Sequence, residues 1–373
     1  MVSISIIIVN YNARYFLKNC IGSILSSDII DTIEIIVVDN NSSDGSSEML
    51  QKNFPQVTCL RNTENVGFSK ANNKGVAVAK GNYVLILNPD TVVSETTLSE
   101  MLHFSESQAH FGAAGVQFMD GAGKFLPESK RNFPNLKVAG AKLLGYSKYY
   151  YANHLQKETT AEIDILTGAF MLVKRKVYEE VGGFDEDFFM YGEDIDLSYR
   201  ISKAGYKNYY VGSCKVLHFK GESTVKDKFY LRNFYGALSI FYKKHFPNNT
   251  ALYMLIDGLI NAIISVKSIS APGRSPAQAK VNSWIYMGEN EDIFEQLKLK
   301  LPSSKGVILN AVSDEIKDSE MVFYDSSCFT FTDIIEAISN PLIEKVKKRI
   351  IYRDHSFYLG SDASDERGEV ITL

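Results

Sequence analysis

The segment from Tyr83 to Asp90 constrains the fold of this chain more strongly than any other. Its first five residues, Tyr-Val-Leu-Ile-Leu, carry no charge and predict a strand that is buried on both faces. Because Pro89 cannot donate a hydrogen bond to a sheet, the strand ends before it and Asp90 follows the carboxyl end of a central strand. Ligands of open α/β sheets bind at that edge, and a carboxylate there suits a divalent cation that binds a diphosphate. An aspartate after proline is also common in simple turns. Other parts of the sequence are therefore needed to decide whether Asp90 is a metal ligand or a turn residue.

The N-terminal half contains more strands of the same kind. Apolar runs at 5–9, 33–39 and 57–61 alternate with segments of helical periodicity, which predicts an α/β fold with a mainly parallel sheet and crossover helices. Two of these runs end in polar residues, at Asn10-Tyr11-Asn12 and at Asp39. Since the carboxyl ends of parallel strands lie at one edge of a sheet, we expect these groups and Asp90 to converge on one crevice.

The remainder of the chain divides by composition. Residues 113–118, 163–173, 209–212 and 215–218 are strand candidates, 174–181 and 193–204 are expected helices, and 120–160 show no clear pattern. Beyond residue 221, aromatic and basic residues predict helices at 229–245 and 252–267, followed by a linker at 270–276 that is rich in Pro, Gly and Ser. We therefore expect a catalytic domain at 1–225, a helical segment at 226–270, and a small α/β accessory domain at 277–373.

The overall composition excludes several classes of protein. A net charge of −4 in 373 residues gives no reason to expect nucleic-acid binding. The four cysteines, Cys20, Cys59, Cys214 and Cys328, form no Cys-x-x-Cys pair, which is typical of reduced cysteines in a cytoplasmic protein. The first residues do not resemble a signal peptide, and no segment is long and apolar enough to span a bilayer.

A second acidic candidate site is formed by Glu193 and Asp194. They follow an aromatic loop and begin a predicted helix, where the helix dipole stabilises a carboxylate whether or not it has a chemical role. The apolar neighbours favour a functional interpretation, because partial desolvation makes a carboxylate basic enough to accept a proton. Asp196 and Arg200 lie four residues apart on this helix and are expected to form a surface ion pair.

His218 is a candidate metal ligand, because it follows a short predicted strand in a chain that already has a candidate metal carboxylate. A single histidine is more often a structural residue than a ligand. Both interpretations stay open at this point.

In combination, these segments resemble the family 2 glycosyltransferases, and in particular the rhamnosyltransferase-like branch of bacterial surface-polysaccharide synthesis. The matching segments are Ile8–Asn12, Val38–Ser46, Asn65–Phe68, Asn72-Asn73, Asn88–Asp90, Thr167–Ala169 and Gly182–Leu197. The resemblance covers roughly residues 3 to 245. It implies a GT-A fold, in which a Rossmann-like nucleotide-binding sheet is followed by an acceptor-binding half.

The resemblance also assigns roles to individual residues. The pattern implies that Asp194 is the catalytic base, with Glu193 as the second candidate. Asp90 matches the last residue of the family's Asp-x-Asp motif, in which Asn88 replaces the first Asp, so Asp90 and His218 are the expected ligands of Mg²⁺ or Mn²⁺. The residues assigned to donor binding are Val9, Asn10, Tyr11, Asn12, Asp39, Asn65, Gly67, Asn73, Asn88 and Gly168.

The implied reaction is an inverting transfer of a sugar such as rhamnose or galactose from a nucleoside diphosphate to a hydroxyl group. The acceptor is a glycan or a polyprenyl-linked glycan, which places the protein in the cytoplasm, at the inner face of the membrane if the acceptor is lipid-linked. The helices at 226–270 then have two interpretations. Their basic and aromatic residues suit an interfacial membrane helix, or they pack on the catalytic domain or on a second copy in a homodimer.

Two other functions share parts of this pattern. A dinucleotide-dependent oxidoreductase would need Gly-x-Gly-x-x-Gly after the first strand, where this chain has Asn10-Tyr11-Asn12-Ala13-Arg14. A non-catalytic protein that binds sugar nucleotides or carbohydrate is the alternative from a different class. The presence of both Asp90 and the Glu193-Asp194 pair favours the enzyme.

Overall fold

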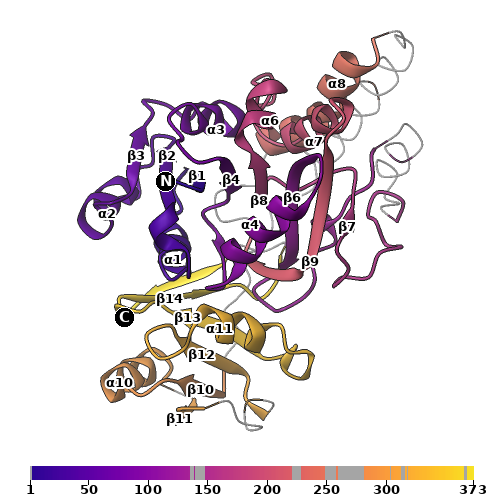
Figure 1. Cartoon of the computed structure of the whole chain (residues 1–373). Coiled ribbons are helices and arrows are strands. Elements are labelled where there is room, and N and C mark those ends of the chain that lie inside the picture. The colour runs from indigo at the N-terminus through magenta and orange to yellow at the C-terminus, as the bar shows by residue number, and fades with distance from the viewer. Residues whose placement is uncertain are drawn as a thin grey trace.

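The chain forms two β-sheets with flanking helices, shown in Figure 1. The computed structural model describes residues 2–134, 138, 148–220, 228–247, 258, 281–302, 304–311, 316, 318–364 and 368–373. The first sheet occupies the N-terminal part of the chain, drawn in indigo to pink, and the second lies beneath it in orange and yellow.

The first sheet is mixed, with a parallel N-terminal half. Its order is β3 (Thr58–Arg61), β2 (Ile33–Asp39), β1 (Ile4–Asn10), β4 (Tyr83–Leu87), β8 (Phe170–Lys174), β6 (Phe111–Met119), β9 (Lys207–His218) and β5 (Thr91–Val92), and β7 (Ala161–Glu162) pairs with β9. Strands β3, β2, β1 and β4 are parallel, whereas β8 is antiparallel to both β4 and β6. All five residues of β4 are buried, as the apolar run predicts.

Helices cover both faces of this sheet (Figure 1). They are α1 (Arg14–Ile24), α2 (Ser46–Asn53), α3 (Phe68–Val76), α4 (Thr97–Ser107), α6 (Arg175–Glu180), α7 (Glu193–Lys203) and α8 (Lys228–His245), with single 3₁₀ turns η1 (Ile30–Thr32) and η2 (Pro127–Ser129). The crossovers β1–α1–β2 and β3–α3–β4 give the alternation that the N-terminal half predicts.

The second sheet has the order β11 (Lys305–Leu309), β10 (Ser283–Met287), β12 (Met321–Asp325), β13 (Lys347–Ile351), β14 (Phe357–Gly360) and β15 (Glu369–Thr372). Its helices are α10 (Glu291–Lys300) and α11 (Phe331–Ile338), with the 3₁₀ turn η4 (Pro341–Ile343). The sequence of this part predicts strands near 307–309, 321–324 and 349–352 and a helix near 332–338, and the structure confirms them as β11, β12, β13 and α11. The sequence did not predict β10, α10, β14 and β15.

The two sheets share one hydrophobic core. Phe16, Val92, Leu217 and Phe219 of the first half pack in a single cluster with residues of the second sheet and of α11. Gly22 is a close contact in this interface, because a Cβ there would lie 2.8 Å from the ring of Tyr352. The second sheet and α11 therefore pack against the strands β5 and β9 of the first sheet. The domain boundaries themselves stay predictions.

Two expectations need correction. Residues 163–173, expected as a strand or as a bent strand with a glycine kink, are regular only in β8, and the chain turns at Gly168-Ala169. The two predicted strands at 209–212 and 215–218 are one strand, β9, whose register against β6 shifts between Val116 and Gln117. The predicted helix at 252–267 and the linker at 270–276 lie outside the described residues.

Candidate active site

The loops after β1 and β2 are tied together by Asp39. This side chain is fully buried, and its Oδ1 accepts from Asn10 Nδ2 at 2.9 Å while its Oδ2 accepts from Ser42 N at 3.0 Å. Asn10 Nδ2 also donates to Ser42 Oγ, at 3.0 Å. The predicted convergence of the β1 and β2 ends is thus confirmed as geometry. Because Asp39 is enclosed by these partners, its direct role in this structure is to hold the two loops in place.

The other predicted donor-binding residues of this region line the same edge. Asn12 has a left-handed backbone and accepts a hydrogen bond from Ser43 N, while Tyr11 is exposed and Val9 is half-buried. Asn65 Oδ1 accepts from Gly67 N at 3.0 Å, which closes the loop before α3.

Gly67 is the position where a glycine is required. Its φ is +87°, and a Cβ there would lie 2.5 Å from the carbonyl oxygen of Phe189. Because Phe68 N donates to that same oxygen at 2.7 Å, the loop before α3 lies against the loop before α7. This contact brings the nucleotide side of the sheet next to the Glu193-Asp194 segment.

Asn73 is engaged differently from the expectation. Its side chain donates to Phe184 O at 2.8 Å and accepts from Tyr178 Oη at 2.6 Å and from Phe184 N at 3.0 Å. Two grooves of about 370 and 430 Å³ adjoin it, lined by α3, α6 and the 181–186 loop. These contacts favour a structural role for Asn73, as the residue that joins α3 to this loop. Its assignment to the nucleotide pocket stays a prediction.

Asp90 and His218 lie together at the end of β4. Asp90 Oδ1 is 3.4 Å from His218 Nε2, and both side chains are more than nine-tenths buried. The short strand β5 sets this proximity, because Thr91 pairs with His218 across the sheet and Phe219 N donates to Asp90 O at 3.0 Å. Asn88 Nδ2 is also 3.4 Å from His218 Nε2. Asn88, Asp90 and His218 thus lie together, and the assignment of Asp90 and His218 as metal ligands stays a prediction.

The arrangement fits a divalent cation that the protein binds through few side chains. A carboxylate oxygen and an imidazole nitrogen are suitable ligands for Mn²⁺, and they leave most coordination positions for phosphate oxygens and water. Among the described residues, no group of three or more His, Cys, Asp or Glu side chains surrounds a point. The Nδ1 atom of His218 is buried and has no hydrogen-bond partner among the described residues. The orientation of the ring therefore depends on packing against its neighbours, among them Phe118, whose ring centroid lies 5.4 Å from that of His218.

Asp194 is held by an arginine that the sequence did not assign. Arg131 Nη2 lies 2.7 Å from Asp194 Oδ2, which also accepts from Gly168 N at 3.2 Å. Burial opposes the charge on Arg131, but the Asp194 carboxylate and the Tyr150 hydroxyl together outweigh burial and raise the pKa of the guanidinium. Arg131 Nη1 donates to Tyr150 Oη at 3.2 Å. The contact with Arg131 therefore orients the Asp194 carboxylate.

Glu193 has the opposite environment. Its carboxyl group is 6% exposed, and its Oε2 has no hydrogen-bond partner among the described residues. Burial, and then the charge of Asp194, raises its pKa to about 8. At pH 7 Glu193 is therefore mainly protonated and cannot accept a proton, which favours Asp194 as the base of this pair.

The two acidic sites lie on either side of one turn. Gly168 N donates to Asp194 Oδ2, and Asn88 N donates to the carbonyl oxygen of the next residue, Ala169, at 3.0 Å. Asp90 follows Asn88 by two residues, so Asp90 and Asp194 flank the Thr167–Ala169 turn. The two acidic side chains are therefore connected through one short turn of the backbone.

Comparison with known proteins agrees with this geometry. A model described as "Glycosyl transferase family 2" matches residues 5–182. The N-acetylglucosaminyl-diphospho-decaprenol L-rhamnosyltransferase of Mycobacterium tuberculosis (strain ATCC 25618 / H37Rv) is 30% identical over 241 residues, which cover 60% of this chain and 78% of that protein. The chain belongs to glycosyl transferase family 2.

Other relatives of this family 2 glycosyltransferase are similar over the same extent. Rhamnosyltransferase WbbL of Escherichia coli (strain K12) is 30% identical over 222 residues, covering 57% of this chain and 82% of WbbL. Among solved structures, the mannosyltransferase PcManGT from Pyrobaculum calidifontis has 16% identity and a TM-score of 0.47 over 80% of this chain and 81% of that one. The resemblance to rhamnosyltransferases, expected from the motifs, is confirmed by these relatives, and the expected α/β fold with a parallel N-terminal sheet is confirmed by the structure.

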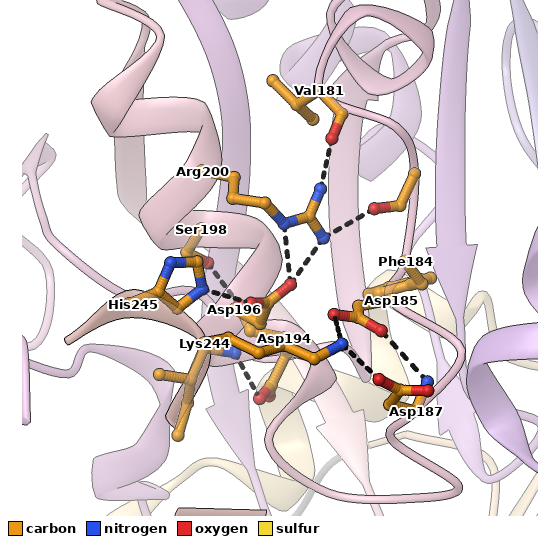
Figure 2. A network of polar contacts seen from close by, with 12 residues as sticks. Val181, Phe184, Asp185, Asp187, Asp194, Asp196, Ser198, Arg200, Lys244 and His245 are labelled. Atoms are coloured by element: carbon orange, nitrogen blue, oxygen red, sulfur yellow. Dashed lines mark hydrogen bonds and ion pairs between the residues drawn. The ribbon is translucent and has the colours of Figure 1, made fainter. Parts of the chain in front are cut away.

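Helix α8 of the glycosyltransferase packs against α7, the helix that begins at Glu193 (Figure 2). Asp196 is fully buried, where its Oδ1 is 2.6 Å from His245 Nε2 of α8 and its Oδ2 is 2.7 Å from Arg200 Nε. The expected ion pair between Asp196 and Arg200 is confirmed, but its expected surface position is wrong, because α8 covers this face of α7. Lys244 reaches two acidic residues of the preceding loop, Asp185 and Asp187, the latter at 2.5 Å.

These contacts bear on the membrane interpretation of the helical segment. The aromatic side chains Phe241 and Tyr242 of α8 are 1% exposed and pack with Phe188 and Ala237. The described part of this segment therefore turns aromatic residues inward, as the packing interpretation predicted. No helix among the described residues has both the length and the apolar character needed to cross a bilayer.

The sequence assigned no role at the site to Arg131 and Glu128, although both contact the segment of the Thr167–Ala169 turn. They belong to the region 120–160, which follows β6 without helical or strand periodicity. Their only local signal is a short charged segment, Glu128-Ser129-Lys130-Arg131, in which Lys130 and Arg131 are buried. Burial of this kind depends on distant segments and could not be inferred from the local pattern.

Proposed function

We propose that this glycosyltransferase transfers a sugar, with L-rhamnose as the first candidate, from a nucleoside-diphosphate donor to a hydroxyl group of a glycan or a lipid-linked acceptor, with inversion. The observation that carries the proposal is the position of Asp90 and Asp194 on either side of the Thr167–Ala169 turn. The two rhamnosyltransferase relatives support the choice of sugar, and the M. tuberculosis enzyme supports a polyprenyl diphosphate-linked acceptor.

Asp194 is the base in this reaction. Arg131 and the Gly168 amide both contact its Oδ2 and fix the orientation of the carboxylate. The acceptor hydroxyl gives its proton to Asp194 as its oxygen attacks the anomeric carbon from the side opposite the diphosphate. Glu193, protonated at neutral pH, supplies a neutral neighbour that does not compete for the proton.

Asp90 and His218 would hold a divalent cation, Mg²⁺ or Mn²⁺. When bound, such a cation stabilises the negative charge of the departing nucleoside diphosphate. The loops around Asn10, Asp39 and Gly67 would bind the nucleoside part, and the turn at Gly168 would face the sugar. A lipid-linked acceptor would place the protein in the cytoplasm at the inner face of the membrane. Flotation with vesicles containing anionic lipid tests that contact.

A donor screen tests the proposal. The purified protein is incubated with Mn²⁺, a lipid-linked acceptor and a panel of nucleotide sugars, and release of nucleoside diphosphate is measured. We expect one donor to be turned over, and Asp194→Asn to abolish turnover while donor affinity in calorimetry changes little. Asp90→Ala should instead weaken the metal-dependent binding of the donor. Donor binding without turnover across the whole panel would support the non-catalytic alternative.

A further inference from the structure

An ion pair between Glu128 and Lys220 lies between the metal side and the base side of the site. Lys220 Nζ is 2.6 Å from Glu128 Oε1. Lys220 follows His218 by two residues, and Glu128 precedes Arg131 by three. Thr167 Oγ1 donates to Glu128 O at 2.5 Å, which fixes Glu128 to the same turn that Asp90 and Asp194 flank. The reaction described above uses neither side chain.

Glu128 is largely buried and ionised. Burial alone would raise its pKa, but the nearby Lys220 ammonium outweighs burial, and with a smaller contribution from His218 the pKa is lowered. The side chain of Glu128 is 20% exposed and that of Lys220 is 33% exposed. The pair is thus reachable from solvent on the lysine side, whereas the carboxylate is enclosed.

The backbone at Lys220 is held in an uncommon conformation. Its φ is +61°, a left-handed value that costs a residue with a Cβ about 1 kcal/mol. The preceding residue, Phe219, is 1% exposed, packs 5.4 Å from the ring of Phe16 and donates its N–H to Asp90 O. These contacts keep the base of the lysine side chain next to the metal side of the site, while the four-carbon stem is free to redirect the ammonium group.

We propose that Lys220 is a donor-binding residue. Before the donor binds, Glu128 holds the Lys220 ammonium group in place, and when a nucleotide sugar binds, the ammonium group moves to its diphosphate. The inference rests on the proposed function, because it requires a nucleoside-diphosphate ligand at Asp90 and His218. A diphosphate presents more negative charge and more acceptor oxygens than one carboxylate, so it competes for the ammonium group. Glu128 then acts as a competitor of the donor, since its charge favours the unbound state.

This role predicts that substitution of Lys220 and substitution of Glu128 change nucleotide affinity in opposite directions. An ion pair that only stabilises the site (a brace) would not give opposite effects. Binding of UDP, dTDP and GDP, each with Mn²⁺, is measured by calorimetry on the full chain. For the nucleotide that binds the wild type most tightly, Lys220→Met should weaken binding about tenfold or more, the value of one hydrogen bond to a charged group. Glu128→Gln should tighten it by about threefold, because the competing carboxylate is gone.

A matched control is the exposed ion pair Lys207–Glu162, whose atoms are 2.5 Å apart. Lys207→Met and Glu162→Gln should leave nucleotide affinity unchanged. If Glu128→Gln weakens binding as Lys220→Met does, the pair is a brace and the inference is overturned. Unchanged affinity in Lys220→Met overturns it as well, while the proposed function stands. A wild type that binds no nucleotide and turns over no donor overturns both.

Discussion

Arg131 Nη2 lies 2.7 Å from Asp194 Oδ2, and both side chains are largely buried. The arginine comes from the segment after η2 and the aspartate from the first turn of α7, so the pair joins two halves of the site that are 63 residues apart. A buried ion pair of this kind is destabilised most when one partner is removed, because the other charge is then left without compensation.

Replacing Arg131 with methionine should therefore affect both stability and turnover. We expect Arg131→Met to lower the free energy of unfolding by about 3–5 kcal/mol, and to reduce kcat by about 100-fold with little change in the KM of the donor. Denaturant unfolding and steady-state kinetics measure the two effects.

The double variant Arg131→Met/Asp194→Asn separates the ion pair from general damage to the site. Because the uncompensated charge is absent, it should be more stable than Arg131→Met alone. If the effects of the two substitutions on the free energy of unfolding are instead additive, the two charges do not interact, and Arg131 does not orient Asp194.

Glu193 and Asp194 should respond differently to amide substitution. Because the pKa of Glu193 is raised to about 8, glutamine resembles its state at pH 7, and we expect Glu193→Gln to keep transfer within a few-fold of the wild type. Asp194→Asn should abolish it. A turnover loss in Glu193→Gln as large as that in Asp194→Asn would reverse the assignment of the base.

The same shift predicts a pH dependence of stability. A carboxyl group whose pKa is raised by folding binds its proton more tightly in the native state, so its contribution to stability is present below its ordinary pKa and is lost as pH rises through about 8. The wild type should therefore lose thermal stability relative to Glu193→Gln between pH 4.5 and 8. Thermal unfolding of both proteins across this range provides the measurement.

The sequence predicts the parts of this site that follow from strand ends. Asp39 and Asp90 terminate apolar runs, so their place at one edge follows from the periodicity of the chain. Arg131 and Lys220 lie in irregular segments, where no period relates a residue to its neighbours in space. Strand β9 was divided at Gly212 for a similar reason, because a bulge inside a strand resembles a turn in sequence.

The contact between the two sheets was also not predicted from the sequence, and Glu95 illustrates the reason. Its Oε1 accepts from Phe331 N at 2.8 Å and its Oε2 from Thr332 N at 2.8 Å, so a residue before α4 caps helix α11 more than 230 positions later. Glu95→Ala should lower the free energy of unfolding by about 1–2 kcal/mol, as expected for a lost helix cap. The exposed Glu48→Ala of α2 is the control and should change it by less than about 0.5 kcal/mol.

A second contact between the two sheets, made by Lys348, should make stability depend on pH. The side chain is 1% exposed, and its Nζ donates to Ala122 O at 2.9 Å and to Glu344 O at 3.2 Å. Burial outweighs the attraction of Asp120 and Glu344 and lowers the pKa of Lys348 to about 8. The native state thus releases this proton at a lower pH than the unfolded chain does.

Stability should consequently rise with pH where the native lysine is neutral and the unfolded lysine is still charged, between about pH 8 and the ordinary lysine value near 10.4. Relative to Lys348→Met, the wild type should gain stability across this window and show a constant difference below it, because both native and unfolded lysines are then charged. Lys298→Met, at an exposed position of α10, should show no such slope. A wild-type curve parallel to that of Lys348→Met from pH 7 to 10 would mean that the buried lysine keeps its proton, and that the carbonyl oxygens of Ala122 and Glu344 compensate its charge fully.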